Sequence, residues 1–238
     1  MPENTGEPRE FISFPHTPHI AWLSDRPLRE DKLLDPEELH HLFDGEVEIE
    51  EKIDGANLGI SFSGDGELLV QHRGGYLSPP WDGEYNGLEQ WIASRQENLF
   101  DELEGRFVLF GEWCRSRHSI SYDRLPDYLI GFDVFDRSRR CFLDNRRRNS
   151  VLERLEISRP CHVDHGAFSV TDVIAILEKY ESCYRDQGPP EGLYLRRCDS
   201  GQVVARGKLV NSGFVQSIET HWRDKLLPRN TAVFEHGI

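Results

Sequence analysis

The segment Glu46–Phe62 reads EVEIEEKIDGANLGISF, and the interpretation of the whole chain starts from it. Valine and isoleucine alternate with glutamates up to Lys52, a period of two that predicts a strand. The Asp54-Gly55 pair predicts a turn, and the apolar run Leu58–Phe62 predicts a second strand. Lys52 is therefore expected to project from the end of a rigid element.

Lys52 has the chemistry of a nucleophile. A neutral lysine amine can attack phosphorus and form a phosphoramidate, but it must first lose its proton near neutral pH. Burial or nearby positive charge favours that loss, whereas Glu50, Glu51 and Asp54 oppose it. Positive charge must then come from a bound metal or from basic residues elsewhere. The candidates are Arg73, Arg206 and Lys208. The alternative interpretation is a solvated lysine beside a hairpin turn.

Six short motifs occur along the chain, each centred on a polar or aromatic residue. In order they are EKIDG at Lys52, QHRGGYL at Arg73, FVLFGEWC at Glu112, YLIGFDVFD at Phe132 and Asp133, EGLYLRR at Glu191 and VVARGKLV at Lys208. The probabilities of independent chance matches multiply, so an ordered set of motifs is far more specific than any single motif.

The motif at Lys52 resembles motif I, K-x-[DNH]-G, of the covalent nucleotidyltransferases. The other motifs resemble motifs Ia, III, IIIa, IV and V in the family's order. The flanking Glu51 and Asn57 look most like ATP-dependent RNA ligases of the RNA ligase 2 type. The resemblance spans Lys52–Lys208, about two thirds of the 238 residues.

The resemblance implies an α+β fold with an ATP-grasp-like nucleotidyltransferase core, in which antiparallel sheets are flanked by helices. A chain of 238 residues has room for one large domain and at most a small appendage. We expect a disordered arm over residues 1–10, the nucleotidyltransferase domain over residues 11–225 and a tail over residues 226–238. No separate oligonucleotide-binding-fold domain is expected.

The resemblance also implies ATP as cofactor, together with Mg²⁺ or Mn²⁺ held by Glu191. The residues it implies for nucleotide binding are Glu51, Lys52, Asp54, Gly55, Arg73, Glu112, Phe132, Asp133 and Lys208. The catalytic set it implies is Lys52, Glu191, Lys208 and Arg206. One departure is Arg206, because motif V usually reads K-x-K. The charge is kept, but a planar guanidinium differs from an ammonium group.

The local sequence around Glu112 and Phe132 bears on the roles that the resemblance implies for them. Glu112 closes an apolar run where an unpaired carboxylate is costly, and the resemblance implies a ribose hydroxyl as its partner. Phe132 alternates with Ile130 and Val134, so a period of two places all three on one face and Asp133 on the other. Core packing is the default role for Phe132, whereas the resemblance favours stacking on adenine.

Periodicity and turn residues predict the other elements. Helices are expected over Asp35–Phe43, Gly87–Phe100, Asp144–Ile157, Ser169–Cys183 and Phe214–Leu226. Further strands are expected over Glu67–His72, Arg106–Trp113, Asp127–Asp136, Glu191–Arg197 and Gln202–Val210. The last two would form a hairpin that brings Glu191 near Lys208. Cys161–His165 reads CHVDH, which matches no zinc spacing and is interpreted as a loop.

The composition limits how the chain can contact nucleic acid. The 28 Lys and Arg residues against 42 Asp and Glu residues give a net charge of −14, which excludes indiscriminate coating of phosphates. RNA contact should be local, and Arg115, Arg117 and the run Arg137–Arg148 are possible basic sources. A solvated face is an equally good interpretation of each.

The cellular context follows from residue usage. Five cysteines form no paired framework, and the N-terminus has no apolar signal region, so a reduced, cytoplasmic protein is expected. No apolar run approaches the ~18 residues that a membrane span needs, so no membrane association is expected.

The function predicted from these features is an ATP-dependent RNA ligase that seals 5′-phosphate and 3′-hydroxyl ends in RNA repair. A partner protein or self-association would replace the surface that a second domain supplies in relatives. One alternative is a DNA ligase or a capping-type enzyme, although both usually carry an additional domain. The other is a nucleotide- or RNA-end-binding module without catalysis. The physiological RNA substrate is left open.

Overall fold

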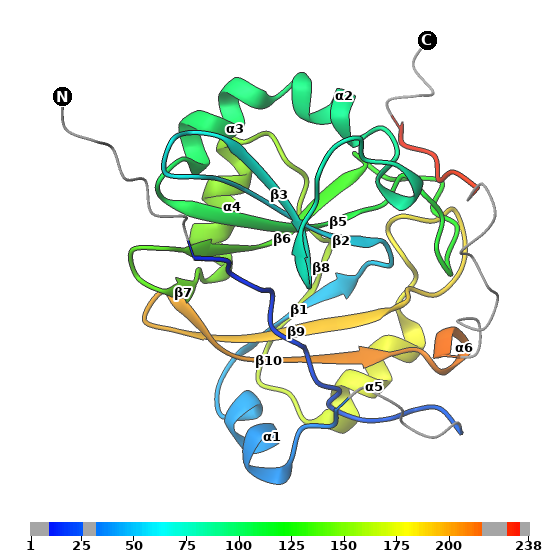
Figure 1. Cartoon of the computed structure of the whole chain (residues 1–238). Coiled ribbons are helices and arrows are strands. Elements are labelled where there is room, and N and C mark those ends of the chain that lie inside the picture. The colour runs from blue at the N-terminus through cyan, green and yellow to red at the C-terminus, as the bar shows by residue number, and fades with distance from the viewer. Residues whose placement is uncertain (1–9, 26–31, 216–227, 234–238) are drawn as a thin grey trace.

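The computed structural model describes residues 10–25, 32–215 and 228–233 of the chain. Two antiparallel sheets pack against each other at its centre, with helices on both outer faces (Figure 1). This arrangement confirms the predicted α+β fold with antiparallel sheets flanked by helices.

The two sheets contain all the long strands. The four-stranded sheet, in the order β10-β9-β1-β8, consists of β1 (Val47–Lys52), β8 (His162–Gly166), β9 (Gly192–Asp199) and β10 (Gln202–Val210). The six-stranded sheet, in the order β4-β3-β2-β5-β6-β7, consists of β2 (Ala56–Phe62), β3 (Leu68–His72), β4 (Gly75–Tyr76), β5 (Phe107–Trp113), β6 (Leu129–Asp136) and β7 (Cys141–Phe142). Since β1 and β2 lie in different sheets, the turn between them crosses from one sheet to the other.

Helices bury the outer faces of the sheets. They are α1 (Pro36–Phe43), the 3-10 turn η1 (Gly83–Tyr85), α2 (Leu88–Ala93), α3 (Gln96–Leu103), α4 (Asn145–Arg154), α5 (Val170–Lys179) and α6 (Ser212–Val215). Helices α2, α3 and α4 share one core cluster with the six-stranded sheet, and α1 and α5 share another with the four-stranded sheet. A smaller cluster around Phe14 and Phe110 lies between the sheets. In the described part, no helix is long and apolar enough to cross a membrane.

Three helices begin where their capping residues predict. The Asp35 carboxylate accepts from the backbone of residues 37 and 38, and Glu38 accepts from the Asp35 amide, which completes a capping box before α1. Asp144 caps α4, and Ser169 caps α5. The helices predicted over 35–43, 144–157 and 169–183 are therefore confirmed, although the last two end earlier than predicted.

Two of the predicted elements are wrong. The single helix predicted over Gly87–Phe100 is two short helices, α2 and α3, separated at Ser94 and Arg95. Cys161–His165 is not a loop, because residues 162–166 form β8 and pair with β1. This strand is at a sheet edge and mostly exposed, so backbone pairing rather than an apolar face defines it.

The C-terminal part contributes to the core. Ala232 is fully buried, and the backbone of residues 228–233 bonds to the loop after β5, for example from Val233 N to Leu125 O. Of the helix predicted over Phe214–Leu226, the structure describes only the start, as α6. The rest of it, and residues 1–9 of the predicted N-terminal arm, lie outside the described residues.

Candidate active site

The turn after β1 is fixed by contacts with the loop that follows β5. Asp54 accepts hydrogen bonds from the amides of Ser119 at 2.7 Å and Ile120 at 3.1 Å, and its own amide donates to the Tyr122 hydroxyl. A Cβ atom on Gly55 would lie 2.8 Å from the Trp113 carbonyl oxygen, so only glycine fits this approach. The turn thereby holds Lys52 at the junction of the two sheets.

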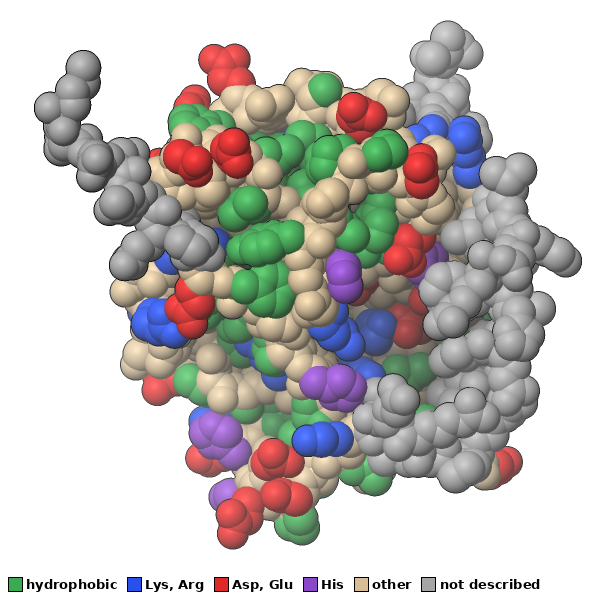
Figure 2. Space-filling model, viewed as in Figure 1, with side chains coloured by type: hydrophobic (Ala, Val, Ile, Leu, Met, Phe, Trp, Pro, Cys, Tyr) green, Lys and Arg blue, Asp and Glu red, His purple; other side chains and the backbone are tan. Residues whose placement is uncertain are grey.

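A cavity with about 700 Å³ of empty space, its mouth included, lies between the sheets beside Lys52. Its walls come from both sheets and from the N-terminal segment. They include Phe14, Thr17, Lys52, Asn57, Arg73, Glu112, Phe132, Tyr194, Arg196 and Lys208. Figure 2 shows basic and acidic side chains gathered in a hollow near the middle of this face.

Lys52 is held by a carboxylate across the four-stranded sheet. Its Nζ atom donates to both oxygens of Glu191, at 2.6 and 2.8 Å. Burial favours the neutral amine, but Glu191, Glu112 and Asp54 outweigh it and raise the pKa of Lys52 above its ordinary value. The free protein therefore holds Lys52 as a cation.

The same site has an excess of negative charge. Burial raises the pKa of Glu112 to about 8, although Lys52 acts in the opposite direction. Burial likewise raises the pKa of Glu191 to about 7, against the attraction of Lys52 and Lys208. Near neutral pH both groups titrate, so a cation bound beside them would displace protons.

Several polar atoms of the cavity wall have no hydrogen-bond partner among the described residues. They are Glu112 Oε2, both amide atoms of Asn57 and the Tyr194 hydroxyl, all buried. Glu112 and Asn57 are neighbours across β5 and β2. Buried polar groups are rarely left unpaired in proteins, so these atoms indicate a polar ligand. Carboxylate and amide oxygens also suit Mg²⁺ or Mn²⁺.

Phe132 lines this cavity because of a β-bulge. The β5–β6 register passes from Phe110 opposite Asp133 to Gly111 opposite Gly131, which leaves Phe132 as the additional residue. Phe132 packs on Phe14, with ring centroids 5.0 Å apart. Ile130 and Val134 belong instead to the core under the helices. The prediction that these three residues share one face is therefore wrong.

Comparison with known proteins agrees with this geometry. A family model described as RNA ligase matches residues 45–210, which is more than half of the chain. The chain belongs to the RNA ligase family. A search of curated protein sequences finds no match.

Solved structures of a Naegleria gruberi RNA ligase share the fold of this family member. One lysine-to-alanine mutant with ATP and Mn has a TM-score of 0.60 and 16% identity, covering 76% of this chain and 54% of that one. A second such mutant has a TM-score of 0.59 and 16% identity, covering 90% and 64%. The enzyme with PPi has a TM-score of 0.58 and 16% identity, covering 87% and 63%. The chain thus spans somewhat more than half the length of these structures.

The RNA ligase motifs converge on the cavity, but not all of them reach it. Lys52, Arg73, Glu112, Phe132 and Lys208 line it together. Glu191 is not part of the cavity wall itself, but it forms an ion pair with Lys52, which is. These placements bring together residues up to 156 positions apart in sequence, but the individual roles that the resemblance implies stay predictions.

Other motif residues have contacts of their own. Asp54 and Gly55 fasten the turn to the loop after β5, as described above. Glu51 lines the cavity, yet its carboxylate accepts hydrogen bonds from Ser182 Oγ at 2.5 Å and Cys183 N at 2.9 Å. A nucleotide contact by Glu51 would therefore involve its backbone.

Asp133 and Arg206 lie behind the cavity wall. Asp133 is fully buried, 3.3 Å from Arg196 Nε and 3.6 Å from Arg206 Nη1. The Arg206 guanidinium also lies over the rings of Phe14 and Phe142, at 5.3 and 4.3 Å. Arginine suits this position better than lysine, because its planar group can stack and form an ion pair at once.

Sequence reasoning missed a buried ionic cluster formed by Glu50, Arg148 and Arg196. Arg148 contacts the Glu50 carboxylate at 2.5 and 2.8 Å, and Arg196 also bonds to it. Both arginines donate to the Phe132 carbonyl oxygen at 2.8 Å. Burial alone would raise the pKa of Glu50, but Arg196 and Arg148 hold it down at about 2. The cluster joins the sheets and fixes the backbone at Phe132.

The basic run Arg137–Arg148 is engaged mostly within the molecule. Arg148 is fully buried, while Arg139 and Arg147 donate to the Gly201 carbonyl oxygen and Arg140 pairs with Glu10. These described contacts lie within the protein, so they favour neither of the two interpretations predicted for the run, a basic RNA surface or a solvated face. The sequence offered no signal for Arg148 as a core residue beyond its place on α4.

Proposed function

We propose that this chain is an ATP-dependent RNA ligase that joins a 5′-phosphate end to a 3′-hydroxyl end. The observation that carries the proposal is the position of Lys52, whose amine lies on a cavity wall beside Glu191. Atoms of Glu112 and Asn57 on the same wall have no hydrogen-bond partner in the described part of the chain. Membership of the RNA ligase family supports the reaction class. The ATP, Mn and PPi of the similar Naegleria structures support the nucleotide and the metal.

Lys52 is the nucleophile of the first step. Its neutral Nζ attacks the α-phosphorus of ATP, an N–P bond forms, and the P–O bond to pyrophosphate breaks. Lys208 and Arg73 line the same cavity and would balance charge on the phosphates. The protein's task in this step is mainly to position the reacting groups.

The proton on Lys52 must leave before the attack, and Glu191 now stabilises it. Glu191 and Glu112 have the donor atoms for a divalent cation, as the fit of the unpartnered carboxylate oxygen indicates. A bound cation would supply positive charge that offsets these carboxylates and favours the neutral amine. With a cation on Glu191, that carboxylate would no longer hold the proton on Lys52, and the proton would pass to solvent.

The adenine would lie against Phe132, whose ring packs edge-to-face on Phe14 in the same cavity wall. In the second step the adenylate passes from Lys52 to the RNA 5′-phosphate, which restores the amine. In the third step the 3′-hydroxyl oxygen attacks that phosphorus and AMP leaves.

We place the protein in the cytoplasm, in keeping with five free cysteines. We assign the positioning of the RNA partly to a partner chain or to a second copy of this chain.

The test is covalent labelling with ATP that carries ³²P at the α-phosphate, in Mg²⁺ or Mn²⁺, followed by a denaturing gel. Wild type should retain label, and Lys52→Ala should lose it completely. Lys179→Ala, at the far end of α5, is the matched lysine control and should label normally.

The other outcomes separate the alternatives. Bound ATP without label under either metal would overturn the ligase proposal in favour of a binding module. Label from GTP in place of ATP would indicate a capping-type enzyme. Sealing of nicked DNA in preference to RNA ends would indicate a DNA ligase.

A further inference from the structure

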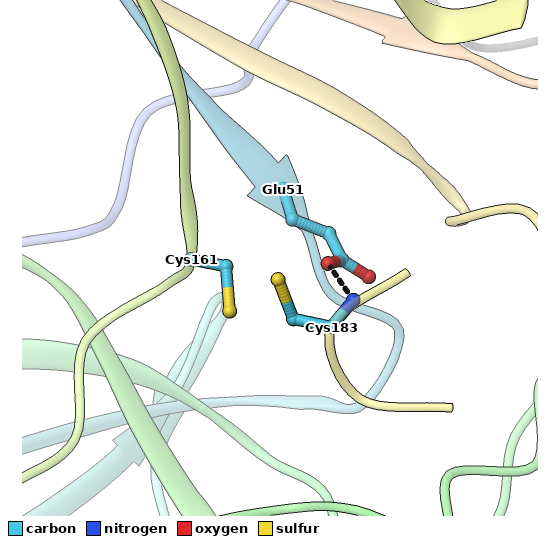
Figure 3. Close-up of side chains that lie close together, drawn as sticks. All are labelled: Glu51, Cys161 and Cys183. Atoms are coloured by element: carbon cyan, nitrogen blue, oxygen red, sulfur yellow. Dashed lines mark hydrogen bonds between the residues drawn. The ribbon is translucent and has the colours of Figure 1, made fainter. Parts of the chain in front are cut away.

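A second group of potential ligands lies beside the cavity, on the opposite side of β1 from the Glu50 cluster. Glu51, Cys161 and Cys183 each offer one ligand atom, and these atoms all lie within 4.8 Å of one another. Figure 3 shows the three side chains pointing toward one another from β1, from the segment before β8 and from the segment after α5. Neither the proposed ligase chemistry nor its metal uses the carboxylate of Glu51 or the two thiols.

The backbone already holds these three residues together. The Glu51 amide donates to the Cys161 carbonyl oxygen at 2.9 Å, and the Cys183 amide donates to the Glu51 carboxylate at 2.9 Å. The ligand atoms lie within 4.8 Å of one another and would have to move closer to bind one cation. A tetrahedral zinc site has ligand atoms about 3.3–3.8 Å apart, given Zn–S bonds of about 2.3 Å and Zn–O bonds of about 2.0 Å.

The surroundings supply the supporting contacts that metal ligands need. Ser182 Oγ donates to Glu51 Oε1 at 2.5 Å, and the Tyr180 hydroxyl lies 3.2 Å from Glu51 Oε2. The same hydroxyl lies 2.9 Å from Cys183 Sγ, where it can donate to a thiolate. Such contacts orient ligands and hold their charge in known metal sites.

We propose that Glu51, Cys161 and Cys183 form a binding site for a thiophilic divalent cation, of which Zn²⁺ fits best. Two sulfurs and one carboxylate oxygen are a zinc ligand set, whereas Mg²⁺ requires oxygen ligands. Cys183 is exposed, so solvent can provide the fourth ligand. The proposal is independent of the ligase reaction and concerns a different metal from the one at Glu191.

Binding would involve proton release and a cross-link. Burial raises the pKa of Cys161 to about 12, so a bound metal would have to displace the thiol proton. The cation would then join β1, one residue before Lys52, to two segments that are more than 100 residues further along the chain. It should therefore stabilise the strand end that carries the nucleophile.

The experiment is a titration of the reduced, metal-stripped, full-length protein with Zn²⁺ against a chromophoric zinc indicator. We expect one Zn²⁺ per chain, and a loss of at least tenfold in affinity in both Cys161→Ser and Cys183→Ser. Cys198→Ser removes a half-buried thiol on β9 and is the matched control, which should bind like wild type. Co²⁺ as a second probe should show sulfur-to-metal charge-transfer absorption.

A second measurement applies even where a serine variant fails to fold. Zn²⁺ should protect Cys161 and Cys183 of wild type from alkylation, as mapped by mass spectrometry, while Cys141 and Cys198 react unchanged. Absence of Zn²⁺ binding, binding that survives both serine substitutions, or a disulfide in place of metal binding would each overturn the proposal. Lys52→Ala should bind Zn²⁺ like wild type, so the ligase proposal can fail separately.

Discussion

Two charge clusters occupy neighbouring positions on β1 and are balanced in opposite ways. Glu50 lies between Arg148 and Arg196, which hold its pKa down at about 2. Lys52, two residues on, contacts Glu191, and the pKa of Glu191 rises to about 7 through burial. The first cluster is complete, in the sense that arginines of the protein neutralise its carboxylate. In the second cluster the carboxylates outnumber the cations.

The difference separates scaffold from chemistry. The Glu50 cluster joins the sheets and holds the backbone of Phe132 through two hydrogen bonds. The Lys52 cluster faces a cavity and leaves an oxygen of Glu112 without a partner among the described residues. A complete cluster should respond to mutation in stability, and an incomplete one in activity. That contrast can be tested directly.

The largest expected effect comes from breaking the complete cluster. Arg148→Met removes one of the two cations that pair with the buried Glu50 carboxylate and should cost about 3–5 kcal/mol in free energy of unfolding. Denaturant unfolding followed by circular dichroism measures this cost. The control is Arg146→Met, an exposed position on the same helix, which should stay within about 0.5 kcal/mol of wild type. Equal stability of the two variants would show that Arg148 is dispensable.

The incomplete cluster should show the opposite pattern. Glu112→Gln keeps the shape of the side chain and removes its charge, so it should slow adenylylation about a hundredfold or more, because charge stabilisation by a held cation contributes several kcal/mol. The variant should still fold. Single-turnover labelling measures the rate, and the control is Glu102→Gln on α3, which pairs with Arg154 and does not line the cavity. A rate within twofold of wild type would remove Glu112 from the site.

A smaller effect is expected in the pH dependence of stability. In the free protein the pKa of Glu112 is about 8 and that of Glu191 about 7, both raised from 4.5 by burial. The folded state therefore binds more protons than the unfolded state between pH 4.5 and 8, and stability should fall as pH rises through this window. Glu50 adds no slope there, because its depressed pKa matters only below pH 4.5.

The matched comparison uses unfolding midpoints measured at several pH values. Glu112→Gln lacks one of the two raised carboxyls, so its stability should fall less between pH 4.5 and 8 than that of wild type. An identical slope in both proteins would contradict the raised pKa of Glu112.

Much of the site could be predicted from the sequence, because most of its residues lie in short motifs that can be found without knowing the fold. Lys52, Arg73, Glu112 and Lys208 were predicted from short segments in a fixed order, and they line one cavity. The paired strands around them follow from alternation and turn residues. The choice of these four residues came from the resemblance of their motifs to a family, and their individual roles stay predictions.

The remainder depends on contacts between distant elements. Arg148 lies in a basic run that is typical of a surface, and only the packing of α4 on the sheets buries it. The bulge at Phe132 breaks the period of two that local alternation assumes. The edge strand β8 has polar residues on both faces, so nothing in its sequence distinguishes it from a loop. All three features depend on contacts with distant parts of the chain, which patterns in a single sequence do not show.

The smallest expected effect concerns Tyr194, which lies between the two clusters. Its ring packs on the Arg196 guanidinium at 4.4 Å, while its hydroxyl is buried on the cavity side without a partner in the described part of the chain. Tyr194→Phe keeps the ring, so stability should stay within about 0.5 kcal/mol. Loss of one hydrogen bond to a bound nucleotide should weaken ATP binding about fivefold, equivalent to about 1 kcal/mol. Titration calorimetry measures that affinity, and Tyr194→Ala, which also removes the ring, should additionally destabilise the fold. A Tyr194→Phe variant that loses stability but keeps its affinity for ATP would assign the hydroxyl to the scaffold cluster instead of the cavity.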